Sequence, residues 1–173
     1  MGLEPITVEK EYIKNGTFIF PFFISKGSLF RIKNFFKLFL SPNSDMMAKI
    51  IINSQSAPAP IGPYSQAVKA GNTLYISGQI ALIPETGAMD NKTIQEETHR
   101  VMKNLGEILK AAGLNYSNVV KSTIFVKDLN NFVAVNQVYG EYFTSEPPAR
   151  ETVEVSRLPK DANVEISCIA VAE

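Results

Sequence analysis

The stretch from Thr93 to Gly113 carries the strongest local structural signal of this chain. Thr93 followed by Glu96 matches a capping box, in which each side chain satisfies an otherwise unpaired backbone N–H at the start of a helix. Apolar residues then recur at helical spacing, and Gly113 is a typical C-terminal stop. The pattern predicts a helix with apolar positions at Ile94, Val101, Leu105, Ile108 and Ala112.

Short β-prone runs lie on both sides of this helix. Two of them, 66–70 and 73–77, are separated by Gly71-Asn72, a pair that suits the positive φ angles of a tight hairpin turn. The remaining strands are expected at 49–53, 121–128, 150–156 and 163–172.

A second helix is expected to begin after Asn130 and to end at Pro147-Pro148, because proline cannot continue a helix. One stripe of this helix consists of Phe132, Val135, Tyr139 and Tyr142. Two helices set among these strands predict an α+β fold, in which both helices pack on one face of a mixed β-sheet.

Composition changes sharply near residue 46. Eight of the eleven phenylalanines lie in residues 1–46, which have a net charge of +2, whereas residues 47–173 have a net charge of −2. We therefore predict an N-terminal extension over 1–46 and one domain over 47–173. The longest apolar run of the extension, 18–24, contains Pro21 and is far shorter than the roughly 20 residues that span a bilayer, so no membrane span is expected.

Three interpretations of the extension stay open at this point. In the first, translation starts at Met46 or Met47, and the upstream residues are a mis-start that is absent or disordered. In the second, the extension is a basic amphipathic helix at a membrane surface, since 30–40 mixes basic and phenylalanine residues. In the third, it is an organelle transit peptide, although Glu4 and Glu9 argue against that.

The residue inventory excludes several kinds of site. The chain has no net charge, which argues against a nucleic-acid partner. One cysteine and one histidine exclude an intrachain disulfide and a zinc site built mainly from Cys and His. Cys168 is expected to be a buried thiol in the last strand, and His99 an exposed residue in mid-helix. Catalysis would therefore depend on carboxylates, hydroxyls, arginine and backbone groups. Nothing in the cysteine content requires an oxidising compartment, and a cytoplasmic location is expected.

Five sequence blocks stand out within 47–173. The most distinctive runs from Pro148-Ala149-Arg150 through Arg157-Leu158-Pro159-Lys160-Asp161 to Val164-Glu165-Ile166. The others are Ile61-Gly62-Pro63-Tyr64-Ser65-Gln66-Ala67, Ile76-Ser77-Gly78-Gln79, Val126-Lys127-Asp128-Leu129 and Val135-Asn136-Gln137-Val138-Tyr139. In order and at the right separations, these blocks resemble those of the Rid family of reactive intermediate deaminases, formerly the YjgF family. The resemblance covers none of 1–46.

The resemblance implies a chorismate-mutase-like fold and a homotrimer with its sites between subunits. It implies hydrolysis of small-molecule 2-imino acids, such as 2-aminoacrylate and 2-iminobutanoate, to 2-keto acids and ammonia, with no cofactor and no metal. By the same resemblance Arg150 binds the substrate carboxylate, Glu165 polarises the attacking water, and Tyr64 completes the catalytic set. The remaining pocket residues would be Ser77, Gly78, Asn136 and Thr152.

Other interpretations remain at the level of sequence. Many deaminases of the family have cysteine at the position of Thr152 and a small residue at that of Glu151, which leaves the preferred imino acid open. By spacing alone, Arg150 and Glu165 could instead form a structural ion pair between consecutive strands. Two alternative functions are a noncatalytic trimer that binds a carboxylate metabolite, and an endoribonuclease or translation inhibitor.

Overall fold

The computed structural model describes residues 49–172. The predicted extension over 1–46, and its boundary with the domain at residue 47, lie outside these residues. Within the described part of the chain, no helix is long and apolar enough to cross a bilayer.

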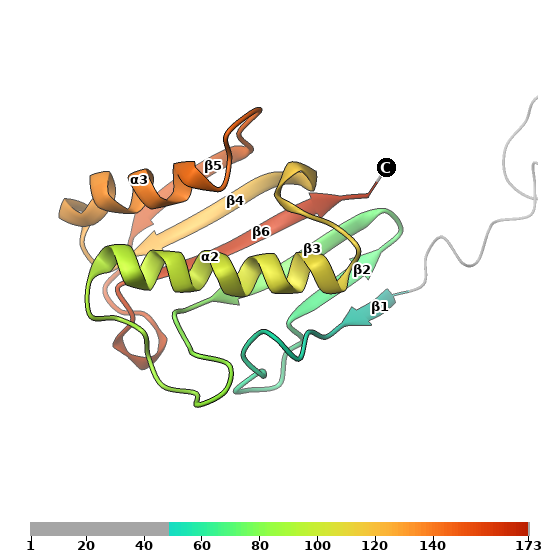
Figure 1. The fold of residues 1–173 in the computed structure, drawn as a ribbon, viewed down its shortest axis with the longest axis horizontal. Helices are drawn as coiled ribbons and strands as arrows, with labels where there is room; N and C mark the ends of the chain where they lie inside the picture. Colours follow the sequence, from blue (N-terminus) through green and yellow to red (C-terminus); the bar gives the residue numbers. More distant parts are fainter. Residues whose placement is uncertain (1–48, 173) are drawn as a thin grey trace, which may run out of the picture. The chain divides into compact units, whose positions relative to one another are not determined.

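A six-stranded mixed sheet forms the framework of the domain (Figure 1). Its spatial order is β1-β2-β3-β6-β4-β5. The pair β4–β5 is parallel, and every other neighbouring pair is antiparallel. The last strand of the chain therefore lies at the centre, between β3 and β4. The strands are β1 (Lys49–Ile52), β2 (Ala67–Ala70), β3 (Thr73–Gln79), β4 (Val119–Val126), β5 (Ala149–Glu154) and β6 (Val164–Val171).

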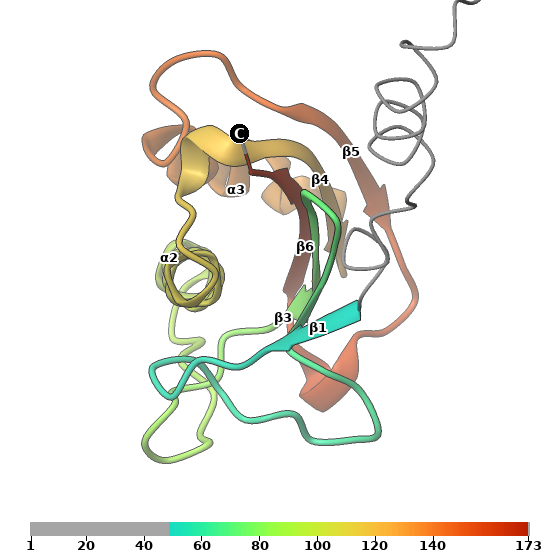
Figure 2. The same ribbon diagram turned by 90° about the vertical axis from the view of Figure 1, so that its right-hand side faces the viewer.

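Two α-helices, α2 (Ile94–Ala111) and α3 (Phe132–Glu141), lie on the same side of this sheet (Figure 2). Alternate residues of β6, from Val164 to Ala170, are buried beneath them together with the apolar stripe of α2. The predicted α+β architecture, with both helices on one face of a mixed sheet, is confirmed.

Of the two bonds of the capping box predicted at the start of α2, only the one made by the Thr93 side chain is present among the described residues. The side chain of Thr93 accepts a hydrogen bond from the backbone N–H of Glu96 at 3.1 Å, as expected for a helix cap. Beyond the helix, Gly113 adopts φ 74, a left-handed conformation that favours glycine. In the hairpin between β2 and β3, Gly71 has φ 58, so the turn also lies where the sequence predicts it.

Two sequence-based expectations about the helices are wrong. Helix α3 ends at Glu141, well before Pro147, because the chain tightens there: Tyr142 N–H bonds to Tyr139 and Phe143 N–H bonds to Gly140, both three residues back. His99 is half-buried rather than exposed, since its ring lies against Tyr142 across the gap between the two helices, with Nδ1 at 3.1 Å from the tyrosine oxygen.

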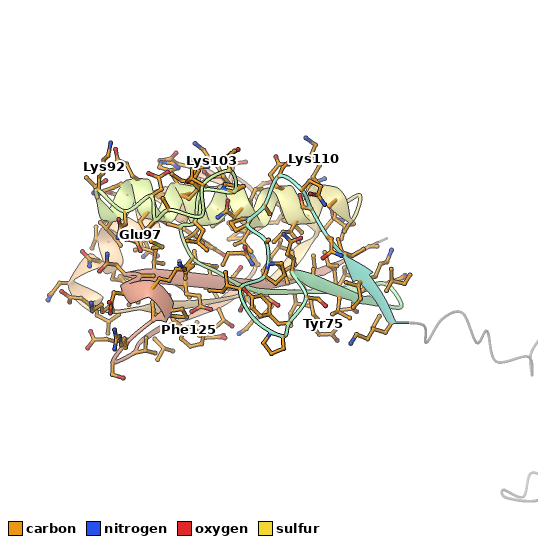
Figure 3. All side chains as sticks on the ribbon, turned by 90° about the horizontal axis from the view of Figure 1, so that it is seen from below. Tyr75, Lys92, Glu97, Lys103, Lys110 and Phe125 are labelled. Carbon is orange, nitrogen blue, oxygen red and sulfur yellow. The ribbon has the colours of Figure 1, made fainter. Side chains whose placement is uncertain are left out.

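The other face of the sheet carries exposed apolar side chains, and we call it the open face. Tyr75 and Phe125 point away from α2 on this face (Figure 3), and Tyr75 remains 51% exposed. Glu151 also lies there, paired with Lys121 and Thr123 on the neighbouring strand β4. Other exposed apolar side chains in phase with these are Ile51, Val153 and Val171.

A β-bulge interrupts the pairing of β3 with β6. Ile76 pairs with Cys168 but Gln79 pairs with Ile166, so β3 has one residue more than β6 over this interval. The extra residue falls at Ser77-Gly78, two of the positions predicted to line a substrate pocket. Bulges leave a residue outside the ladder and change the direction of nearby side chains.

Candidate active site

Arg150 is held by helix α3. Its position in β5 is level with Ser122 of β4, so its side chain points to the helix-covered face. There Nη1 donates a hydrogen bond to Asn136 Oδ1 at 2.6 Å. The guanidinium carbon lies 5.8 Å from the ring centre of Phe132 and 5.2 Å from that of Tyr139, both within the range of a cation–π contact.

These contacts fix the guanidinium without using all of its donors. Asn136 accepts one N–H, which leaves the rest of the five-donor fork for an anion. The Tyr139 hydroxyl is itself tied down, because it donates to Ser122 Oγ at 3.0 Å. Burial raises the pKa of Tyr139 and keeps that hydroxyl protonated. The guanidinium borders a cavity of about 510 Å³, also lined by Asn136, Tyr139, Gly140, Phe143, Pro147 and Pro148.

Glu165 is the second charged residue of the predicted site. It is on β6, with its side chain directed to the open face beside Phe125. The side chain lies hard against Gly78, since a Cβ atom built on that glycine would be 1.9 Å from Glu165 Oε1. Burial raises the pKa of Glu165, which suits a carboxyl group that takes up and returns a proton.

A cavity of about 270 Å³ opens beside this carboxylate. Tyr64, Ser77, Gly78 and Glu165 all line it, so the structure brings four of the seven predicted site residues together. Much of the remaining wall is apolar, and two of its residues, Ile61 and Tyr64, are exposed, so the cavity opens to solvent. The further lining residues are Pro58, Ala59, Ile61, Gln66, Gln79, Ile80, Leu82 and Pro159.

Gln66 organises the loop that forms one wall of this cavity. Its amide oxygen accepts from Ser54 N–H at 2.6 Å, and its Nε2 lies 2.8 Å from the carbonyl oxygen of Pro58. Nearby, Ser77 Oγ donates to the carbonyl of Ser65 at 2.7 Å. Sequence reasoning matched Gln66 to a family block but gave it no role, because its partners are eight to twelve residues away.

Phe132 and Tyr139 are functional neighbours that the sequence analysis placed on a helix stripe without linking them to Arg150. The signal was present, since 132, 136 and 139 are spaced i, i+4 and i+7 and therefore share one face of a helix. What the sequence lacked was the position of β5 beneath that face.

The two charged residues do not meet within one chain. β4 lies between β5 and β6, and Arg150 is in the row of Ser122 and Cys168, whereas Glu165 is in the row of Phe125. Side chains an odd number of residues apart on one strand point to opposite faces of a sheet, and Ser122 and Phe125 are three residues apart on β4. The structural ion pair considered from spacing is therefore wrong, and the Arg150 and Glu165 cavities are separate in the single chain.

Thr152 is on the same face as Arg150, two residues along β5, as the strand period predicts. Its Oγ1 is shielded from solvent and has no hydrogen-bond partner among the described residues, and a buried hydroxyl without a partner costs free energy in a folded protein.

The remaining candidates for reactive side chains have structural roles. Cys168 is buried, which confirms the expectation of a buried thiol in the last strand, and burial raises the pKa of this thiol to about 12. Within 49–172, no three His, Cys, Asp or Glu side chains gather as a metal site.

Comparison with known proteins assigns the chain to a family. A family model described as Endoribonuclease L-PSP matches residues 54–172. Reactive Intermediate Deaminase A, chloroplastic, from Arabidopsis thaliana is 46% identical over 145 residues, which is 83% of this chain and 78% of the relative. The chain belongs to the Rid (YjgF) family. Two further Rid comparisons agree with this placement.

The 2-iminobutanoate/2-iminopropanoate deaminase of Mus musculus is 49% identical over 121 residues, or 70% of this chain and 90% of that protein. The crystal structure of the YjgF gene product from E. coli superimposes with a TM-score of 0.69 at 44% identity, covering 72% of this chain and 99% of the other. The family model itself begins at residue 54, whereas the match to the Arabidopsis Rid protein is longer than 47–173 alone could provide and so extends upstream of residue 47.

Proposed function

We propose that this Rid protein hydrolyses 2-imino acids to 2-keto acids and ammonia. Two observations carry the proposal together: a preorganised guanidinium, Arg150, on one face of the sheet, and a half-buried carboxylate, Glu165, whose pKa is raised, on the other. Two relatives named as deaminases, at 46% and 49% identity, support the same reaction class.

In the proposed mechanism Arg150 binds the substrate carboxylate through its free N–H groups. Water attacks C2 of the imine while Glu165 accepts a proton from that water, and the imine nitrogen takes up a proton from solvent, which gives a carbinolamine. Glu165 then gives its proton to the nitrogen, and the C–N bond breaks so that ammonia leaves. The C2 hydroxyl passes its proton to Glu165 as C2 becomes the keto carbon, and Glu165 releases this proton to solvent. One water is consumed for each ammonia released.

Tyr64, Ser77, Gly78, Asn136 and Thr152 would complete the site. The Ser77 hydroxyl already donates to Ser65, so it can meet substrate only as an acceptor. The hydroxyl of Tyr64 accepts a weak bond from Ile61 N–H at 3.3 Å and keeps its own proton to donate to the substrate or to the attacking water. Thr152 would use its unpaired hydroxyl in the position where many relatives have a thiol.

The active form would be a homotrimer with each site between two subunits. A second copy is needed because one chain places Arg150 and Glu165 on opposite faces of its sheet. The open face supports association, since it leaves Tyr75 and Val153 half exposed and gathers them with other apolar side chains. Sedimentation velocity on the purified chain would measure the subunit number, and a monomer at micromolar concentration would contradict this part of the proposal.

The decisive experiment generates 2-aminoacrylate with a serine dehydratase and follows keto-acid release with and without the protein. We expect acceleration by the wild type and by Arg100→Ala, a matched loss of an arginine that pairs with Asp90 and lines neither of the two cavities. Arg150→Ala should abolish the acceleration. Absence of any effect of the wild type, with the oligomer intact, would instead favour a noncatalytic carboxylate-binding protein.

An RNA-directed activity is the other candidate, because the matching family model is described as an endoribonuclease. Cleavage of RNA that survives Arg150→Ala and falls steeply with added salt would support it. We expect no such cleavage, since the chain has no net positive charge to attract a phosphate backbone.

The predicted cytoplasmic location also stays a proposal. The Arabidopsis relative is chloroplastic, and its match reaches upstream of residue 47. Expressing the full chain and a form that begins at Met47, each fused at the C-terminus to a fluorescent protein, distinguishes the interpretations. A cytoplasmic signal from both supports the cytoplasmic proposal, whereas organelle import that requires 1–46 identifies a targeting segment.

A further inference from the structure

Glu97 is a buried carboxylate for which the mechanism above has no use. It lies in the first turn of α2 and is 0% exposed, between the helix and the sheet (Figure 3). No lysine, arginine or histidine of 49–172 forms a salt bridge with it. Burying a carboxylate costs free energy unless hydrogen bonds replace its hydration. The role of Glu97 is therefore inferred from the groups that donate hydrogen bonds to it.

Both carboxylate oxygens of Glu97 bond to one residue, Asn163. Oε1 accepts from the backbone N–H at 2.7 Å, and Oε2 accepts from Nδ2 at 2.8 Å. The carbonyl of Asn163 in turn accepts from the N–H of Lys127 at 3.0 Å, just after β4 ends. Asn163 thus joins α2, the end of β4 and the start of β6.

The segment that leads to Asn163 is constrained on its other side as well. Lys160 and Asp161 adopt φ 54 and 56, a left-handed conformation that costs free energy for residues with a side chain. Leu158 and Ala162 are buried in a small second core, and Pro159 lines the cavity beside Glu165. Without an anchor at Asn163, this loop has no other charged contact to α2 in the described chain.

We propose that Glu97 is a positioning residue that fixes the start of β6 and thereby the carboxylate of Glu165. Glu165 is two residues beyond Asn163, and its side chain has little room, because it lies against the backbone of Gly78. A small shift of β6 would therefore move the carboxylate relative to the cavity. The inference rests on the proposed function where it treats Glu165 as the proton acceptor.

The proposal can be tested by exchanging the carboxylate of Glu97 and the amide of Asn163. Asn163→Asp places two carboxylates face to face and removes the Nδ2 donor. Glu97→Gln combined with Asn163→Asp restores every donor and acceptor, since the new amide on α2 would accept from the backbone N–H through its oxygen and donate to the new carboxylate through its nitrogen. Val101→Ala, one turn along the same buried face of α2, is the matched control that loosens the core without touching Asn163.

Two quantities are measured: kcat/KM against pH, and the titration of the Glu165 carboxyl by carbon NMR, with Glu165→Gln identifying the resonance. We expect Asn163→Asp to lower kcat/KM about ten- to a hundredfold and to move the Glu165 titration, and the double variant to reverse both changes. The control should lower the melting temperature and leave the titration in place.

Failure of this inference is separable from failure of the proposed function. If the wild type shows no turnover but the Glu165 titration moves in Asn163→Asp and returns in the double variant, positioning stands and the deaminase assignment falls. If Val101→Ala moves the titration as much as Asn163→Asp does, or the double variant fails to restore it while folded, Glu97 has a purely structural role and the inference is overturned.

Discussion

Arg150 and Glu165 lie on opposite faces of one sheet, with β4 between the strands that carry them. Arg150 faces the rings of α3, whereas Glu165 faces the open side and the bulge of β3. A ligand that needs both side chains must therefore lie between two chains. This relationship governs how the proposed activity can be tested.

Mixing two inactive variants tests the shared site directly. Arg150→Ala and Glu165→Gln should each be inactive, but trimers that contain both can form some sites with an intact arginine from one chain and an intact glutamate from the next. Each mixed trimer has one intact site of three, so the purified mixed trimers should show about a third of the wild-type activity. Co-expression with two affinity tags and tandem purification yields the mixed trimers, and no recovery in them would place each site within one chain.

Asn136→Asp should weaken substrate binding more than it slows chemistry. The new carboxylate, 2.6 Å from the guanidinium of Arg150 in the position of the amide oxygen, would compete with the substrate carboxylate. Because that contact is present in both ground and transition states, KM should rise about tenfold or more while kcat changes little. Asn136→Ala, which removes the bond without adding charge, should raise KM less. Equal KM values for both variants would contradict the argument.

Glu165 should give activity an acid limb at an unusually high pH. Burial raises its pKa, so kcat/KM should fall on the acid side at a pH above the ordinary glutamate value of about 4.3. The free energy of unfolding depends on pH in the opposite direction. Because the pKa of Glu165 is raised in the folded state, this residue stabilises the fold at pH values below its pKa in the unfolded chain, and that contribution is lost as pH rises through the folded-state pKa.

Glu165→Gln should therefore abolish turnover near neutral pH without lowering the melting temperature. Glu85→Gln, at an exposed turn, is the matched control and should leave both unchanged. A large loss of stability in Glu165→Gln would show that the carboxylate holds the fold together.

Gly78→Ala should displace the carboxylate of Glu165. The new Cβ would lie 1.9 Å from Glu165 Oε1, closer than any real contact, so one of the two must move. We expect turnover to fall and unfolding free energy to decrease by about 1–3 kcal/mol, as for other overpacked sites. In a Glu165→Ala background the stability loss should shrink, which a double-mutant cycle in urea would measure. An unchanged loss would place the conflict elsewhere in the bulge.

Cys168 should resist thiol reagents in the folded protein. It is 5% exposed, and burial raises its pKa to about 12, so almost no thiolate exists at pH 8. Iodoacetamide should label it within minutes in strong denaturant and very slowly in native buffer, as followed by mass spectrometry. Rapid labelling of the native chain would indicate local opening of β6.

The sequence by itself determined the features that depend on neighbours along the chain. Thr93 caps α2 through a residue three positions away, Gly71 turns one hairpin, and Cys168 is buried because β6 alternates. It also carried the family blocks that identify Arg150 and Glu165, and the strand period that places Thr152 beside Arg150. These depend on local periods and backbone preferences, which a single segment specifies.

Tertiary structure decided how those residues are distributed in space. The parallel pairing of β5 with β4 separates Arg150 from Glu165, because it inserts a strand between them and puts them in rows of opposite direction. The bulge at Ser77-Gly78 and the contact of Glu97 with Asn163, 66 residues apart, likewise depend on which elements become neighbours. Strand order and register are set by packing across the whole sheet, so local periods could not show why the proposed site needs a second chain, which the sequence implied only through its family resemblance.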